Sequence, residues 1–121
     1  MTRKALVVDD SSTMRQMISM TLEEEGFDVV QGEHGEAALS QLEGRDVDVI
    51  ITDLNMPVMD GMEFIRSVRT RPKHRFTPIL ILTTEGSTDR KAEGKEAGAN
   101  GWIVKPFDPA KLVRVVRRVV A

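Results

Sequence analysis

The 121-residue sequence contains no cysteine, and this absence excludes both a disulfide framework and a thiolate metal site. It also lacks a long hydrophobic run, since the apolar stretch at residues 5–8 is too short for a signal-peptide core or a membrane span. The length fits one domain, because domains most often contain about 100–150 residues. We therefore expect a cytoplasmic protein with a single domain at residues 1–121, no separate output domain and no membrane insertion.

Basic charge is in slight deficit, with 17 basic residues against 19 acidic ones and a net charge of −2. A general nucleic-acid-binding domain is typically basic, so no nucleic-acid partner is expected. The basic residues do form two stretches, one with Arg66, Arg69, Arg71, Lys73, His74 and Arg75 and one with Arg114, Arg117 and Arg118. We interpret both as solvated helix ends and loops. His34 and His74 have no partners at metal-ligand spacing, so both are expected at the surface.

Short apolar runs alternate with amphipathic segments along the whole chain. The runs predict buried strands at residues 6–8, 47–51, 79–82 and 103–104, with a weaker candidate at 27–30. The first helix is predicted to carry one apolar face, with Ser11 or Ser12 as N-cap and Gly26 as stop; the face comprises Met14, Met17, Ile18, Thr21 and Leu22. Further helices are predicted at residues 36–42, 62–68 and 88–97 and around Leu112, Val115, Val116 and Val119.

Five strand–helix repeats predict an α/β fold, a doubly wound parallel sheet with helices on both faces. Ligands of such sheets bind at the carboxyl ends of the strands, near the point where the strand order reverses. The residues that follow the predicted strands are Asp9 and Asp10, Asp53, Thr83 and Lys105. The topology therefore gathers three carboxylates, a hydroxyl and an ammonium group at one edge of the sheet.

Carboxylates this close together repel one another, and a divalent cation relieves the repulsion. An all-oxygen site without His or Cys favours a hard ion such as Mg²⁺. A cation, a lysine and a threonine hydroxyl around a spare carboxylate can hold a phosphoryl group while that carboxylate attacks it in line.

Each of these residues alone also has an ordinary structural explanation. The Asp9-Asp10 pair could cap a helix, Asp53 could belong to a turn, and Thr83 could simply end a strand. Lys105 could be a surface lysine. Their coincidence at one sheet edge, in this order, favours a site.

Four ordered motifs resemble the receiver domain of two-component response regulators. They are Val8-Asp9-Asp10-Ser11, the segment 53–61 beginning Asp53-Leu54-Asn55-Met56-Pro57, Thr83-Thr84-Glu85 and Val104-Lys105-Pro106-Phe107. The resemblance spans the chain and is greatest to the stand-alone chemotaxis receivers of the CheY type. It implies a flavodoxin-like (βα)5 fold with five parallel strands in the order 2-1-3-4-5.

The resemblance also implies a role for each matching residue. Asp53 is the phosphoacceptor, and the Mg²⁺ site consists of Asp53 with Asp10, Asp9 (through water) and the backbone carbonyl of Asn55. Thr83 is the switch hydroxyl, and Lys105 pairs with the phosphoryl group.

The surrounding residues have implied roles as well. Pro57 and Gly61 shape the loop after the third strand, and the Lys105–Pro106 bond is expected to be cis, since cis peptides are essentially a proline feature. Asn55 and Glu85 tune water access to the phosphoryl group, and this polar pair implies short-lived phosphorylation. Trp102 occupies the place of a rotating aromatic.

Two departures from the family pattern stand out. Trp102 is larger than the usual Tyr or Phe, so on activation its ring either turns inward or stays out; a fixed tryptophan packed over the sheet edge is the alternative. The helix at residues 88–97 has almost no apolar face, and Gly94 in its interior costs roughly 1 kcal/mol relative to Ala. We expect this helix to be frayed or mobile.

The function implied is signal relay. A histidine kinase donates a phosphoryl group to Asp53, the chain catalyses its own phosphorylation and dephosphorylation, and an altered surface of helix four, strand five and helix five binds an output protein, as in chemotaxis. The unphosphorylated chain is expected to be a monomer.

The sequence leaves other functions open. The chain could serve as a phosphate sink for the kinase, or as a phosphatase with an aspartyl-phosphate intermediate. A flavodoxin-like FMN carrier would share the fold, but Asp9 and Asp10 would repel the FMN phosphate.

Overall fold

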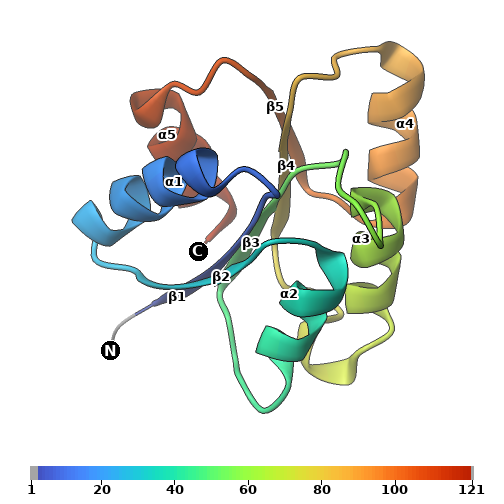
Figure 1. Cartoon of the computed structure of the whole chain (residues 1–121), viewed down its shortest axis with the longest axis horizontal. Coiled ribbons are helices and arrows are strands. Elements are labelled where there is room, and N and C mark those ends of the chain that lie inside the picture. The colour runs from blue at the N-terminus through green and yellow to red at the C-terminus, as the bar shows by residue number, and fades with distance from the viewer. Residues whose placement is uncertain (1–2, 121) are drawn as a thin grey trace.

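The computed structural model describes residues 3–120, in which five strands alternate with five α-helices and one short 3₁₀ helix follows α3 (Figure 1). The strands are β1 (Lys4–Val8), β2 (Asp28–Gly32), β3 (Val49–Thr52), β4 (Ile79–Thr83) and β5 (Gly101–Val104). The helices are α1 (Ser12–Glu24), α2 (Gly35–Leu42), α3 (Gly61–Arg69), α4 (Thr88–Ala97) and α5 (Pro109–Val119), with the 3₁₀ helix η1 at Pro72–His74. This alternation confirms the predicted element order.

The strands form one parallel sheet in the order β2-β1-β3-β4-β5, which confirms the predicted flavodoxin-like topology. Helices α1 and α5 cover one face of the sheet, and α2, α3 and α4 cover the other (Figure 1). The strand order reverses between β1 and β3, because the chain leaves β1 toward β2 and returns past it to β3. The carboxyl ends of these two strands therefore flank the crevice where ligands of such sheets bind.

The sheet separates two hydrophobic cores. Leu6 and Val8 point into the core under α2 and α3, whereas Ala5 and Val7 point into the core under α1 and α5. Because both faces of each central strand are buried, its sequence is a continuous apolar run without polar alternation.

The helix ends follow the local sequence signals. Ser11 caps α1, because its hydroxyl accepts a hydrogen bond from the N–H of Met14 at 3.2 Å. Gly98 ends α4 at φ +120°, a backbone conformation that favours glycine. Helix α4 spans the predicted residues 88–97 as a continuous helix, with Gly94 and Ala97 buried.

The predicted apolar face of α1 is partly wrong. Ile18 and Leu22 are buried as expected, but Ser19 is buried too, while Met17 is 44 % exposed. The helix is rotated so that Met14, Ile18 and Leu22, spaced four residues apart, contact the core.

The prediction that His74 lies at the surface is also wrong. Its side chain is buried, with Nε2 3.1 Å from the carbonyl oxygen of Arg45 and Nδ1 3.1 Å from the hydroxyl of Thr77. Because a carbonyl only accepts, Nε2 carries the hydrogen in the neutral ring and Nδ1 accepts from Thr77. The ring can be buried because both of its nitrogens find partners, one in the connection between α2 and β3 and one in the segment before β4.

Arg69 departs from the prediction of a solvated basic stretch. Its guanidinium donates hydrogen bonds to the carbonyl oxygens of His74, Thr77 and Gly98 and to the side chain of Asn100. Arg69 therefore ties α3 to the loop before β4 and to the end of α4.

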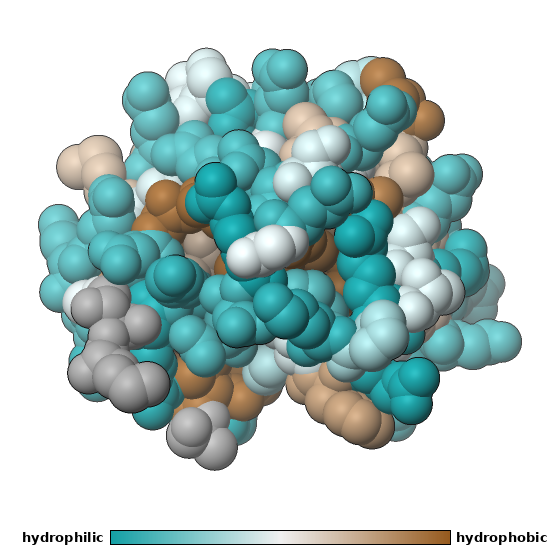
Figure 2. Space-filling model, turned by 90° about the horizontal axis from the view of Figure 1, so that it is seen from below, coloured by the Kyte–Doolittle hydropathy of each residue, from teal (hydrophilic) through white to brown (hydrophobic). Residues whose placement is uncertain are grey.

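The face seen in Figure 2 is mainly hydrophilic, with apolar residues in separate small groups between polar ones. Within residues 3–120, no helix combines the length and the apolar character needed to cross a membrane.

Candidate functional site

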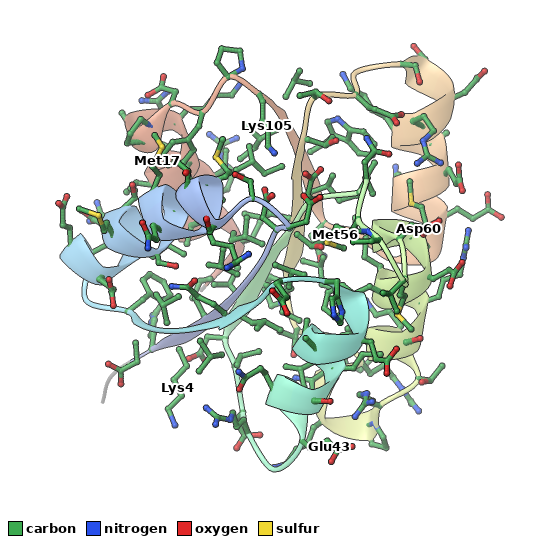
Figure 3. All side chains as sticks on the ribbon, in the orientation of Figure 1. Lys4, Met17, Glu43, Met56, Asp60 and Lys105 are labelled. Atoms are coloured by element: carbon green, nitrogen blue, oxygen red, sulfur yellow. The ribbon has the colours of Figure 1, made fainter. Side chains whose placement is uncertain are left out.

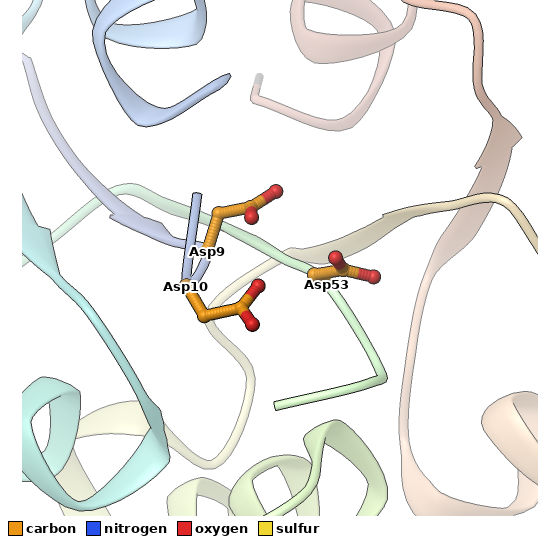
Figure 4. Close-up of side chains that lie close together, drawn as sticks. All are labelled: Asp9, Asp10 and Asp53. Atoms are coloured by element: carbon orange, nitrogen blue, oxygen red, sulfur yellow. The ribbon is translucent and has the colours of Figure 1, made fainter. Parts of the chain in front are cut away.

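Three carboxylates meet at the reversal point of the sheet. Asp9 and Asp10 leave the end of β1, and Asp53 directly follows β3. Each side chain offers a carboxylate oxygen within 4.8 Å of the others, and Figure 4 shows the three side chains close together. Asp9 and Asp53 are buried, whereas Asp10 is exposed to solvent. The sequence prediction that topology brings these three residues together is confirmed.

Lys105 reaches the same cluster from the end of β5. The Nζ of Lys105, which Figure 3 labels, lies 3.1 Å from Oδ2 of Asp9 and 3.1 Å from Oδ2 of Asp53, so the ammonium group bridges the two buried carboxylates. The site thus combines three negative charges with one positive charge.

Burial and charge shift two pKa values in this cluster. Burial raises the pKa of Asp9, and this effect outweighs the hydrogen bonds from the Ser11 N–H and Lys105, which lower it. Burial lowers the pKa of Lys105, but the carboxylates of Asp53 and Asp9 raise it by more, so its net pKa lies above the ordinary value. Lys105 therefore stays positively charged at neutral pH.

The donor set suits a hard cation. The cluster offers carboxylate oxygens, one of them on the exposed Asp10, and contains no sulfur or imidazole ligand among the three grouped residues. Mg²⁺ takes one or two carboxylates plus water and phosphate oxygens, so these residues fit a magnesium ion.

The loop after β3 is held close to Asp53. Oδ1 of Asp53 accepts a hydrogen bond from the N–H of Leu54 at 2.7 Å, and the N–H of Gly61 donates to the carbonyl of Leu54 at 2.8 Å. A side chain at Gly61 would collide with the carbonyl oxygen of Asp53 and lie 2.7 Å from Cα of Leu54. Glycine at this position therefore lets α3 begin directly beneath the acidic cluster.

Pro57 and Asn55 are exposed in the loop after Asp53. Between Pro57 and Met59 the chain makes a tight turn with Val58 at φ +72°, an unusual conformation for a β-branched residue. The Lys105–Pro106 peptide bond is cis, as predicted.

Thr83 and Trp102 are joined through the backbone of Glu85. Thr83 is buried at the end of β4, and its hydroxyl accepts a hydrogen bond from the N–H of Glu85 at 3.4 Å. The carbonyl of Glu85 accepts from the indole Nε1–H of Trp102 at 2.8 Å. One residue thus bonds the expected switch hydroxyl on one side and the half-buried indole on the other.

Sequence reasoning missed two arginines around the site. Nε of Arg90 lies 2.9 Å from Oε2 of Glu85, and its Nη1 lies 2.7 Å from Oε1 of Glu93, so the Glu85 side chain is tied to α4. Nη1 of Arg15 donates to the carbonyl of Asp9 at 2.7 Å. Nothing in a single sequence shows toward which neighbour a flexible arginine turns, although Arg15 does lie one turn into the helix that follows Asp9 and Asp10.

Fold and site together define a flavodoxin-like α/β domain with an acidic cluster at its strand-order reversal and a half-buried lysine that reaches this cluster from the end of β5. The chain belongs to the response regulator receiver domain family, whose model matches residues 5–117.

Among named relatives, the chain is similar to chemotaxis proteins. A CheY homolog of Campylobacter jejuni is 48 % identical over 111 residues, which cover 90 % of this chain and 85 % of the relative. CheY1 of Helicobacter pylori is 45 % identical over 111 residues, with 90 % of each chain covered.

The chain is also similar in structure to solved receiver proteins. The structure of Vibrio cholerae CheY4 matches with a TM-score of 0.95 and 49 % identity, covering 98 % of this chain and 99 % of that one. The receiver domain of a Pseudomonas aeruginosa sensor histidine kinase matches with a TM-score of 0.90 and 28 % identity over 99 % of this chain and 98 % of that one. That neighbour was solved with a magnesium ion coordinated in its active-site cleft.

Proposed function

We propose that Asp53 accepts a phosphoryl group from the phosphohistidine of a kinase and that the chain relays this signal to a partner protein. The observation that carries the proposal is the convergence of Asp9, Asp10 and Asp53 with Lys105, in a chain of the receiver family. In the transfer, a carboxylate oxygen of Asp53 forms a bond to phosphorus while the bond from phosphorus to the donor nitrogen breaks.

The metal in this proposal is Mg²⁺, which would be held by the carboxylates of Asp10 and Asp53 and the backbone carbonyl of Asn55, with Asp9 contributing through water. The magnesium-bound receiver domain from Pseudomonas aeruginosa supports this choice. When bound, Mg²⁺ would neutralise carboxylate charge and charge on the phosphoryl oxygens.

Lys105 supplies the positive charge that the chain itself contributes. Its raised pKa keeps the ammonium group charged, and its position between Asp9 and Asp53 lets it donate to an oxygen of a phosphoryl group on Asp53. The same groups favour attack by water on the acyl phosphate, so the chain also catalyses its own dephosphorylation.

The signal leaves the site through Thr83. Movement of the Thr83 hydroxyl toward the phosphoryl group would pull on the N–H of Glu85, whose carbonyl holds Trp102 and whose side chain holds Arg90 of α4. Phosphorylation would then shift the population toward a different arrangement of α4, β5 and α5.

The output partner would bind across this surface. A hollow of about 310 Å³ lies between α4 and β5, lined by Lys91, Lys95, Ala99, Asn100, Gly101 and Trp102. The chemotaxis relatives support a chemotactic partner for this chain, whose unphosphorylated form we take to be a monomer. A chain that only drains phosphate from the kinase would have the same site without a partner on this surface.

The proposal is tested by mixing the purified chain with a phosphorylated histidine kinase and with a candidate output protein. We expect Mg²⁺-dependent transfer to the chain, and tighter partner binding when beryllofluoride mimics the phosphoryl group. Transfer without any change in partner binding would favour the phosphate sink. Catalytic turnover of a panel of small phosphate esters would favour the phosphatase.

A further inference from the structure

The peptide unit that joins the two metal-site aspartates is held by a side chain from outside the acidic cluster. The N–H of Asp9 donates to the carbonyl of Gly32 at 3.2 Å, and Oδ1 of Asp9 accepts from the N–H of Ser11 at 2.9 Å. The carbonyl of Asp9 accepts instead from Nη1 of Arg15 at 2.7 Å. Asp10 begins at this same peptide unit, so the orientation of the unit governs the direction of the Asp10 side chain.

Arg15 is itself fixed from two directions. Its backbone N–H donates to the carbonyl of Ser11 at 2.9 Å in the first turn of α1. Its Nε donates to the side-chain carbonyl of Gln31 on β2 at 3.3 Å, and the backbone carbonyl of Gln31 accepts from Gln41 of α2 at 3.2 Å. A guanidinium is planar with donors in a fixed fork, so one partner on each edge sets its orientation.

We propose that Arg15 is a positioning residue of the magnesium site: it holds the Asp9–Asp10 peptide unit so that the exposed Asp10 carboxylate stays close to those of Asp9 and Asp53 (Figure 4). The inference rests on the proposed Mg²⁺ site. Mg²⁺ demands nearly ideal octahedral geometry, so a ligand that turns away weakens binding sharply. Groups that orient metal ligands typically contribute about 10–100-fold to metal affinity.

A positioning role and a purely electrostatic role predict opposite results. The guanidinium is positive, so its charge alone repels Mg²⁺, and its removal would tighten binding. Arg15 is partly exposed, and solvent screens such repulsion at the surface. The affinity lost when Asp10 is no longer oriented should therefore exceed the affinity gained when the positive charge is removed. Removal of Arg15 should then weaken Mg²⁺ binding.

The test is an MgCl₂ titration of the full chain, followed by NMR through the backbone amides of Asp10 and Asp53. We expect Arg15→Ala to weaken Mg²⁺ binding by roughly 10-fold. Gln31→Ala, which leaves the charge in place but frees the guanidinium, should weaken binding by a smaller factor in the same direction. Arg66→Ala is the matched control, because Arg66 is exposed on α3 and pairs with Glu93 at 3.7 Å, away from the acidic cluster.

Urea unfolding of the metal-free variants separates positioning from stability. The proposal expects the affinity loss in Arg15→Ala even where the free energy of unfolding equals that of Arg66→Ala. Equal or tighter Mg²⁺ binding by Arg15→Ala overturns the positioning role. If the parent chain itself binds no Mg²⁺, the proposed function fails at its metal site, which is a different result.

Discussion

The indole ring of Trp102 on β5 packs directly against Gly94 of α4. A Cβ added at Gly94 would lie 2.8 Å from Cζ3 of Trp102 and 2.9 Å from Cδ1 of Ile81, closer than such atoms pack. The indole can therefore occupy this space because Gly94 has no side chain there. The glycine that weakens the helix locally is what lets a tryptophan lie beneath it.

This packing makes a prediction about Gly94→Ala. In a helix the change should stabilise by roughly 1 kcal/mol, but overpacking against a fixed ring costs about 1–3 kcal/mol. We expect the free energy of unfolding to fall in the parent chain and the cost to shrink or reverse when Trp102→Leu removes the ring. The two changes should therefore couple by at least about 1 kcal/mol in a double-mutant cycle.

Glu96→Ala, at an exposed position on α4 that does not line the hollow beside Trp102, is the control for this cycle and should show no coupling to Trp102→Leu. If Gly94→Ala has the same effect with and without the indole, the two residues do not constrain each other.

Trp102 also reports on activation. Its Nε1–H is bonded to Glu85, whose N–H is bonded to the Thr83 hydroxyl, so displacement of Thr83 should change the surroundings of the indole. Titration with beryllofluoride in Mg²⁺ should give a saturable change in tryptophan emission that Asp53→Asn abolishes. Hydrogen exchange across Thr88–Ala97 should change with it. Flat signals while the mimic binds would make Trp102 a fixed structural residue and place the output elsewhere.

The phosphoryl group on Asp53 should be short-lived. Asn55 is exposed two residues beyond Asp53, and Glu85 lies two residues beyond Thr83 with its carboxylate tied to Arg90. Replacing either polar residue by Ala should alter the hydrolysis rate of the phosphorylated chain, followed by loss of radiolabel in Mg²⁺ buffer. Glu36→Ala, on the exposed side of α2, serves as the control. A phosphoryl half-life of many hours in the parent chain would contradict this prediction.

The raised pKa of Asp9 makes the metal-free protein sensitive to pH. Because the folded-state pKa lies above the unfolded one, the contribution of Asp9 to stability is present at pH below the unfolded value and is lost as the pH rises through the folded value. We expect Asp9→Asn to unfold like the parent in acid but to be more stable than the parent at neutral pH without Mg²⁺. Urea unfolding across this pH range measures the difference.

Asp28→Asn controls for the loss of one negative charge, since Asp28 is an exposed carboxylate at the start of β2. An advantage of Asp9→Asn that is constant with pH would show that burial of the Asp9 charge is not its cause.

The fold followed from patterns that report burial directly. Residues 6–8, 49–51 and 79–82 are continuous apolar runs because both sheet faces are covered, and the Asp, Thr and Lys that end the strands must then share one edge. Two kinds of contact were not predictable in this way: those that depend on how a helix is rotated about its axis, and those that depend on which partner a polar side chain finds in the fold. Met17 shows the first case, since a small turn of α1 moved it into solvent.

The second case is polar residues whose side chains form hydrogen bonds inside the protein. His74 and Arg69 are indistinguishable in sequence from solvated basic residues, and only the fold supplies the carbonyl groups that they bond. The same holds for Gly94, which in sequence only weakens a helix and in the structure makes room for Trp102.

The central claim is that Asp53 is the phosphoacceptor, and incubation with radiolabelled acetyl phosphate in Mg²⁺ tests it most directly. The parent chain should incorporate label, and Asp53→Asn should incorporate none, because an amide cannot form the acyl phosphate. Asp10→Asn should label only at higher Mg²⁺, since it weakens the metal site first. Full stoichiometric labelling of Asp53→Asn at another residue would contradict the account.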